Sequence, residues 1–187
     1  ASGDVTATLA FAEDSGLNDA ARVGTTATRS DGGYKLDGIK SFVLDGHTAD
    51  LIVVLARKPG SKGARGLSFF TVDGKAAGLE RRLLKTMDET RKLARLTFNG
   101  VEASLLGGEG KAAAAFAKTM QQVIVCLANE MVGGAERLRE DALDYVKMRM
   151  QFGRSIASFQ TTKNKAADML VDVEMAKSAA YYAAAAI

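Results

Sequence analysis

The sequence predicts a small antiparallel β-barrel or sandwich followed by an antiparallel pair of long helices, because its two halves differ in composition. Residues 4–105 contain short runs of β-forming residues separated by turns rich in Gly and Asp. Residues 111–187 contain no proline and accumulate Ala, Lys, Glu and Met, which favour helix. The glycine-rich segment 107–110 separates the two patterns. We therefore expect a β-domain over 1–106 and a helical domain over 107–187.

Each predicted strand of the first half is a short apolar or alternating run that ends at turn residues. The segment 30–33, Ser-Asp-Gly-Gly, is a hairpin signal between two such runs. The run 51–56 is continuously apolar and of strand length, so we expect it to lie in the core. The predicted strands cover residues 6–12, 24–29, 34–38, 40–44, 51–56, 67–72 and 93–98.

Apolar residues of the second half recur at steps of three and four, which places them on one face of a helix. One helix is expected from Lys111 to about Met150 and another from about Ser158 to the end, with Gly153 suited to a positive φ between them. Such a hairpin is half of an up-down four-helix bundle, and further helices or partner subunits must cover its apolar face. The apolar positions are Met120, Val123, Ile124, Leu127, Met131, Ala135, Leu138 and Ala142 in the first helix, and Ala166, Met169, Leu170, Val173 and Ala176 in the second.

Composition excludes several classes of function. There are 25 basic and 22 acidic residues, giving a net charge of +3 without the basic run that a nucleic-acid-binding protein needs. There is no signal peptide and no apolar run long enough to span a bilayer. Cys126 is the single cysteine, which rules out an internal disulfide and fits the cytoplasm. Because the chain begins without methionine and ends inside a helical stretch, we expect a fragment of a longer protein.

The segment between the two predicted helices carries the most specific motif. Residues 149–160 read Arg-Met-Gln-Phe-Gly-Arg-Ser-Ile-Ala-Ser-Phe-Gln, and Ala-Asp-Met follows at 167–169. This order resembles a signature of the acyl-CoA dehydrogenases: Arg-x-x-Phe-Gly, an aliphatic residue, Phe or His followed by Gln, then Ala-Asp-Met. Residues 38–57 and 96–101 resemble the middle domain of that family, and 13–19 occupy the place of its Thr-Glu-Pro-x-x-Gly-Ser-Asp loop. The resemblance covers essentially the whole chain.

The resemblance implies that this corner binds FAD belonging to a neighbouring subunit. Arg149 would bind the pyrophosphate, because a guanidinium offers a permanent charge and a forked set of donors. The two glutamines would hydrogen-bond polar parts of the dinucleotide, and the two phenylalanines would contact its adenosine half. The residues alone favour a plainer interpretation, in which Arg149 pairs with a carboxylate and the phenylalanines lie in the bundle core. The expected FAD-binding residues are Arg149, Gln151, Phe152, Ile156, Phe159, Gln160 and, by packing on the flavin ring, Phe42.

The family implies an activity and its partners. Its members use FAD to introduce a double bond between the α and β carbons of an acyl-CoA thioester, and they pass electrons to electron-transfer flavoprotein or a similar acceptor. Binding FAD across an interface requires at least a dimer, and the family usually forms tetramers of homologous subunits.

The flavin pocket departs from the family pattern at several positions. Ala12 stands at the threonine of the Thr-Glu-Pro loop, and residues 17–18, Leu-Asn, replace its Gly-Ser pair. Phe42 and Leu44 stand where the family has Trp-x-Thr, and Leu44 has no side-chain donor for the flavin. These losses suggest an alternative: a non-catalytic subunit that keeps the Arg-x-x-Phe-Gly corner and clamps the FAD of a homologous catalytic subunit.

No catalytic base is identifiable in this chain. In some family members the glutamate lies at the position of Val123, beside an arginine at the position of Ile124, and neither side chain here can take a proton. In many others it lies beyond Ile187. We therefore assign no catalytic residue. A flavin-dependent monooxygenase or nitroalkane oxidase of the same fold, and a helical interaction module without cofactor, are further alternatives.

The remaining chemically interesting residues favour plain interpretations. His47, the single histidine, lies in a polar turn without companions for a metal, so no metal ligand is assigned. Cys126 is expected to be a buried, inert thiol, and Glu130 and Glu136 to be paired or solvated. The loosely basic stretch 81–92 is expected to be a solvated face.

Overall fold

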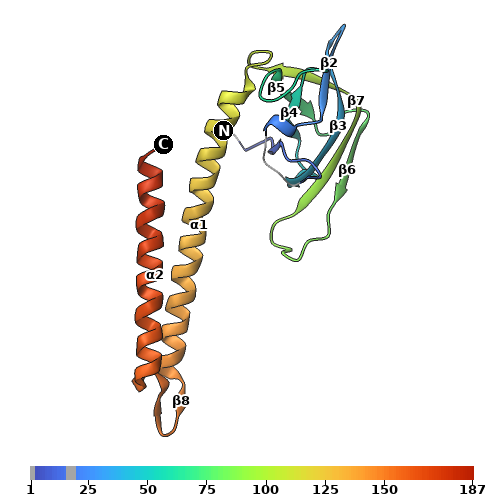
Figure 1. Ribbon diagram of the computed structural model, residues 1–187. Helices are drawn as coiled ribbons and strands as arrows, with labels where there is room; N and C mark the ends of the chain where they lie inside the picture. The colour runs from blue at the N-terminus through green and yellow to red at the C-terminus, as the bar shows by residue number, and fades with distance from the viewer. Residues whose placement is uncertain (1–2, 16–19) are drawn as a thin grey trace. The chain divides into compact units, whose positions relative to one another are not determined.

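The computed structural model describes residues 3–15 and 20–187 (Figure 1). Leu17 and Asn18, which stand in place of the Gly-Ser pair of the family loop, lie outside the described residues. The chain forms two compact units, Ala1–Phe116 and Ala117–Ile187. Among the described residues, no helix has the length and apolar character needed to cross a membrane.

The first unit is a mixed sheet, seven-stranded in the part of the chain that is described. β3 is its central strand and pairs antiparallel with β2 on one side and β7 on the other. β5 pairs antiparallel with both β4 and β7, and β6 pairs with β7. The strands are β1 (Ala7–Ala10), β2 (Thr26–Ser30), β3 (Gly33–Leu44), β4 (Leu51–Arg57), β5 (Leu67–Asp73), β6 (Leu79–Leu83) and β7 (Leu93–Leu106), and a short 3-10 turn η1 (Ala20–Arg22) precedes β2.

The prediction of a purely antiparallel barrel or sandwich is wrong in two respects. β1 runs parallel to β4 over its whole length, because the β2–β3 hairpin lies between them in sequence and acts as the crossover that returns the chain in the same direction. β2 meets β4 in parallel at a single pair, Thr26 with Arg57, so the sheet does not close evenly. The predicted strand positions are otherwise found, with 34–38 and 40–44 joined into β3.

Apolar side chains from both long and short strands fill the interior of the sheet unit. The run 51–56 is buried as expected, with Ile52, Val54 and Leu55 fully enclosed. β6 was not predicted, since its sequence Leu-Glu-Arg-Arg-Leu is mostly polar and it lies at an edge where β7 is its only partner among the described strands. The core cluster also includes Leu36, Val43, Phe70, Val72, Leu96, Phe98 and Val101.

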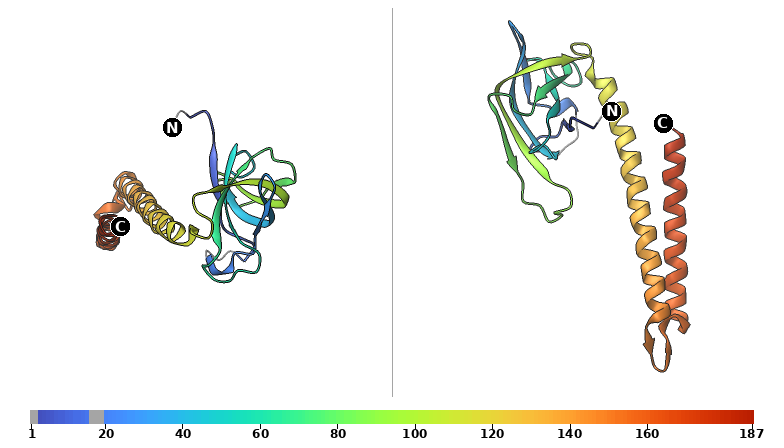
Figure 2. Two further views of the ribbon diagram at one scale, coloured as in Figure 1. Left: turned by 90° about the horizontal axis from the view of Figure 1, so that it is seen from above. Right: turned by 180° about the vertical axis from the view of Figure 1, so that it is seen from behind.

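The second unit is the predicted antiparallel helical hairpin. Helix α1 (Ala112–Met148) begins in the first unit and continues into the second, and α2 (Gln160–Ala185) returns beside it (Figure 2). Lys177 of α2 donates to Glu136 of α1 at 3.1 Å and so ties the two helices together. Much of the apolar stripe is exposed, including Ile124, Met131 and Leu138. The prediction that further helices or subunits cover this face therefore stays a prediction.

Candidate cofactor-binding site

The corner between α1 and α2 is a two-residue β-hairpin. Strand β8 (Met150–Gln151) pairs with β9 (Arg154–Ser155), and Phe152 and Gly153 between them have φ of 51° and 75°. Two positive φ values in succession are those of a type I′ turn, whose twist matches that of the flanking strands. The prediction of a positive φ at Gly153 is confirmed. The positive φ at Phe152 was not foreseen, because side-chain-bearing residues rarely adopt it.

The strand pairing determines which side chains share a face of this hairpin. Gln151 lies opposite Arg154, and the backbone N–H of Ile156 donates to the carbonyl of Arg149 at 2.9 Å, which extends the pairing by one step. Since successive side chains of a strand point to opposite faces, those of residues 149, 151, 154 and 156 lie on the same side. Three of these four are predicted FAD-binding residues.

Serine hydroxyls fix the hairpin to the end of α1. The Ser155 hydroxyl lies 2.8 Å from the carbonyl oxygen of Val146 and 2.9 Å from that of Lys147, two carbonyls that the helix end leaves without intrahelical partners. Ser158 donates from its hydroxyl to the carbonyl of Ser155 at 2.7 Å, across the short turn η2 (Ile156–Ser158). The hairpin is thus fixed to α1 through Ser155, whose side chain lies on the face opposite Arg149, Gln151 and Ile156.

The two predicted phenylalanines lie together at the corner. Their ring centroids are 6.0 Å apart at 87°, an edge-to-face pair, and Phe152 is 90% exposed at the tip of the turn. The guanidinium of Arg154 lies over the ring of Phe159, 4.1 Å from its centroid. Phe152 is thus exposed within this hairpin, and both the FAD-binding role and the bundle-core interpretation stay predictions.

The corner is rich in cations and holds no paired carboxylate. Within the described residues, neither Arg149 nor Arg154 forms an ion pair, and both are exposed. Gln151 is exposed, whereas the amide of Gln160 donates to Asn164 at 2.9 Å in the first turn of α2. The side chain of Ile156 lines a groove between α1 and α2 and is only partly exposed. The donor set therefore fits a phosphate-containing ligand beside an aromatic surface.

Replacing Phe152 with asparagine should raise the free energy of unfolding by about 1 kcal/mol, because asparagine tolerates the left-handed conformation that phenylalanine adopts at a cost. An exposed edge-to-face contact is worth less than this strain. Urea unfolding of the variant checks the prediction, with Phe152→Ala as the control that loses the ring but keeps the strain. A variant less stable than the parent would mean that the aromatic pair outweighs the turn.

Phe42 belongs to the sheet unit and is presented by an irregularity in β3. The pairing of β3 with β7 shifts between Lys40 and Val43, and Phe42 has φ 58°. A bulge of this kind turns one side chain away from its regular direction. Phe42 and Leu44 are consequently both exposed, and the Leu44 side chain carries no donor. Their packing on a flavin stays a prediction.

A buried ion pair beside this bulge fixes the segment in which the family has its Thr-Glu-Pro loop. Lys40 is fully buried, and its ammonium donates to the Glu13 carboxylate at 2.9 Å and to the carbonyl of Phe11 at 3.2 Å. The same carboxylate accepts from the backbone of Gly24 at 2.8 Å and from the backbone and hydroxyl of Thr25 at 2.9 and 2.8 Å. One carboxylate therefore joins three segments of the chain.

Burial has different consequences for the two partners. It lowers the pKa of the Lys40 ammonium from 10.5 to about 8, against the attraction of Glu13, and the charge of Arg57 acts in the same direction as burial. Burial also raises the pKa of the Glu13 carboxyl, but the Lys40 charge and the hydrogen bonds from Thr25 and Gly24 outweigh it and leave that pKa below its ordinary value. Glu13 is therefore the more firmly charged partner.

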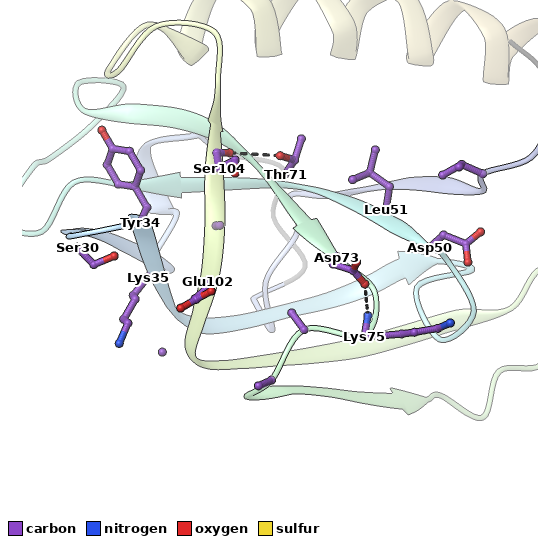
Figure 3. A pocket seen from close by; sticks show the side chains of 16 residues that line it. Ser30, Tyr34, Lys35, Asp50, Leu51, Thr71, Asp73, Lys75, Glu102 and Ser104 are labelled. Atoms are coloured by element: carbon purple, nitrogen blue, oxygen red, sulfur yellow. Dashed lines mark hydrogen bonds between the residues drawn. The ribbon is translucent and has the colours of Figure 1, made fainter.

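A hollow over the sheet, shown in Figure 3, does not define a ligand class. Its side chains carry both signs of charge, with Lys35 and Lys75 near Asp50, Asp73 and Glu102. Asp50 accepts from the backbone and hydroxyl of Thr6 at 2.9 and 2.7 Å, and Asp73 from the backbone of Lys75 at 2.7 Å. Asp50 and Asp73 are therefore satisfied within the sheet unit. In the described part of the chain, no group of three His, Cys, Asp or Glu is placed to hold a metal ion.

Two features of the site were missed from the sequence. Arg154 lies inside the motif, but its stacking on Phe159 depends on the hairpin register. The Glu13–Lys40 pair joins residues far apart in sequence, and only the apolar surroundings of Lys40 in β3 gave a signal that its charge needs a partner. Cys126 is exposed on α1, so the prediction that it is buried is wrong, because the hairpin leaves that face uncovered.

Comparison with known proteins agrees with this architecture. The family model for the acyl-CoA dehydrogenase middle domain matches residues 8–101, and that for the acyl-CoA dehydrogenase C-terminal domain matches residues 113–187. The two matches follow each other along the chain, the first within the sheet unit and the second within the helical part. The chain belongs to the acyl-CoA dehydrogenase family.

Individual relatives extend the comparison. An acyl-CoA dehydrogenase of Bacillus subtilis (strain 168) is 34% identical over 189 residues, covering 98% of this chain and 50% of the relative. The caffeyl-CoA reductase-Etf complex subunit CarC of Acetobacterium woodii is 32% identical over 183 residues, covering 94% and 48%. The solved structure of PigA with FAD and proline has a TM-score of 0.88 at 30% identity, covering 96% and 48%. The chain spans about half the length of the relatives it matches.

Proposed function

We propose that this chain takes part in the flavin-dependent α,β-dehydrogenation of an acyl-CoA thioester, and that its corner at residues 149–160 binds FAD across a subunit interface. The observation that carries the proposal is the exposed guanidinium of Arg149, which forms no ion pair within the described residues, on a hairpin whose tip presents Phe152. An exposed cation and an exposed aromatic ring on the same corner match the phosphate and the adenosine parts of a dinucleotide. FAD, when bound, supplies the hydride-accepting chemistry.

Each residue of the corner has a distinct part in this proposal. Arg149 binds pyrophosphate oxygens with its forked donors, and Gln151 on the same face adds an amide beside it. Gln160 is already oriented by Asn164 and presents its carbonyl oxygen to the polar edge of the ligand. Ile156 packs against the helix corner and supports Arg149 through their backbone bond.

Proton removal from the substrate is assigned to a group outside this chain segment. The position that bears the base in some family members is Val123, and its neighbour is Ile124; both are exposed apolar side chains on α1. Neither can accept a proton, so binding and orienting the cofactor is the contribution we assign to this segment. The partners we propose are an acyl-CoA, an electron-transfer flavoprotein or similar acceptor, and homologous subunits.

One observation favours a second candidate, a non-catalytic subunit that clamps the FAD of a homologous catalytic partner. The β-unit presents Phe42 and Leu44 at the surface where the family has Trp-x-Thr, and Ala12 has no hydroxyl. A flavin against this surface would find no side-chain donor from these three positions. The corner, by contrast, keeps its guanidinium and aromatic residues.

Flavin stoichiometry in the purified assembly tests both candidates. One FAD per chain in a homo-oligomer, with an electron acceptor reduced on addition of acyl-CoA, supports the catalytic subunit. One FAD per two chains, with a second homologous chain present, supports the partner subunit. Absence of flavin absorbance from every assembly, together with no binding of added FAD, contradicts both. Oxygen consumption with a substrate that is not an acyl thioester would instead indicate a monooxygenase or oxidase.

A further inference from the structure

We propose that Arg154 is a second phosphate-binding residue of the corner and that Phe159 serves as its platform. The inference rests on the proposed function, since the ligand is the pyrophosphate of the same FAD. It adds a residue outside the Arg-x-x-Phe-Gly pattern and changes the role expected for Phe159.

The strand register brings the two arginines to one face as diagonal neighbours. Arg149 is bonded to Ile156 across the hairpin, and Gln151 is opposite Arg154. Diagonal positions on one face of an antiparallel pair are separated by about 7–8 Å at the backbone, which long side chains span easily. Both guanidiniums can therefore approach a single group placed over this face.

Two like charges on a diagonal repel each other, and nothing on the hairpin offsets the repulsion. In the described residues, Arg149 and Arg154 have no ion-pair partner, whereas Arg137, on the exposed surface of α1, pairs with Asp141 at 2.8 Å. A ligand with negative charge on two linked phosphates satisfies both guanidiniums at once, and a single small monoanion does so less well.

The aromatic contact fixes where Arg154 stands before any ligand binds. Its guanidinium lies 4.1 Å from the Phe159 centroid, well inside the range of a cation–π contact, while Phe152 meets the same ring by an edge-to-face contact. A long side chain held in this way loses less conformational freedom on binding. Because Arg154 covers one face of Phe159, the exposed ring of Phe152 is the one that contacts the adenosine.

Ligand binding to the assembled protein, after removal of bound flavin, tests this assignment. Calorimetry would compare FAD, ADP and riboflavin at low and high salt for the parent, Arg154→Leu, Arg154→Lys and Arg149→Leu, with Arg137→Leu as the control for loss of an exposed arginine. Arg154→Leu is expected to weaken FAD and ADP about tenfold or more, to reduce the salt dependence of their binding, and to leave riboflavin unchanged. The affinity of Arg154→Lys for FAD and ADP is expected to lie between those of the parent and of Arg154→Leu, because lysine keeps the charge but lacks the forked set of donors.

A double-mutant cycle tests whether Phe159 acts by holding Arg154 or only by packing in the corner. Phe159→Leu should weaken ADP binding when Arg154 is present and have little further effect in Arg154→Leu. Parent-like ADP affinity and salt dependence in Arg154→Leu, with a loss in Arg149→Leu, would overturn the role of Arg154 and leave the proposed function standing. A parent protein that binds neither FAD nor ADP would overturn both.

Discussion

Replacing Glu13 with glutamine lowers the free energy of unfolding by about 3–5 kcal/mol at neutral pH, the largest stability effect expected in this chain. The reason is the fully buried ammonium of Lys40, which loses its counter-charge and is left with neutral acceptors, the glutamine amide oxygen and the carbonyl of Phe11. A buried charge without a counter-charge is far more costly than the pair is worth. Urea unfolding of the sheet unit, followed by circular dichroism, measures the change.

The double variant Glu13→Gln, Lys40→Met is the matched control. It removes both charges at once, and the methionine keeps the apolar part of the buried side chain, so we expect it to recover most of the stability lost in Glu13→Gln, apart from the acceptor that the amide nitrogen cannot offer to Gly24 or Thr25. The single variant Lys40→Met should lose less than Glu13→Gln, because Glu13 keeps its bonds from Gly24 and Thr25. A double variant as unstable as Glu13→Gln would show that the loss comes from the altered hydrogen bonds at Glu13 and that the unpaired charge of Lys40 contributes little.

The same pair predicts how stability depends on pH. In the folded protein the pKa of Lys40 is about 8, whereas the ordinary lysine value is 10.5. Between these values the unfolded chain holds a proton that the folded chain has released, so the free energy of unfolding should rise with pH, by roughly 3 kcal/mol in all. Below pH 8 both states are protonated and Lys40 contributes no slope. Lys40→Met should lack the rise.

Replacing Arg149 with leucine is expected to weaken FAD binding by about 100-fold, the largest effect on the proposed site. The side chain forms no ion pair within the described chain and is exposed, so folding stability should not change. Arg149→Lys keeps the charge but loses the fork and should lose about tenfold. Flavin fluorescence titration measures the affinity. Unchanged affinity in Arg149→Leu would remove the main support for the corner as the cofactor site.

The fold was largely predictable because its two halves have different periodicities. The turns and apolar runs located the strands, and the three- and four-residue spacing located both helices. The parallel pairing of β1 with β4 was not predictable, since strand order depends on contacts between segments far apart in sequence. β6 was not predictable from the sequence, because an edge strand that pairs with one neighbour can be mostly polar.

The candidate site was predictable as a set of residues but not as a geometry. The order of Arg149, Phe152 and Gln160 identified the corner from the sequence alone. The I′ turn depends on a positive φ at Phe152, which propensity argues against, and the stacking of Arg154 on Phe159 follows from that turn. At positions such as Phe152, whose backbone conformation departs from the preference of the residue type, function is expected to compete with local stability.

We propose above all that Arg149 binds the pyrophosphate of an FAD held mainly by another subunit. A crystal structure of the assembled protein loaded with FAD tests it most directly. We predict an Arg149 nitrogen within about 3 Å of a pyrophosphate oxygen of an FAD whose flavin ring lies against a different chain. An FAD whose phosphates lie away from the hairpin of residues 149–160 would contradict it.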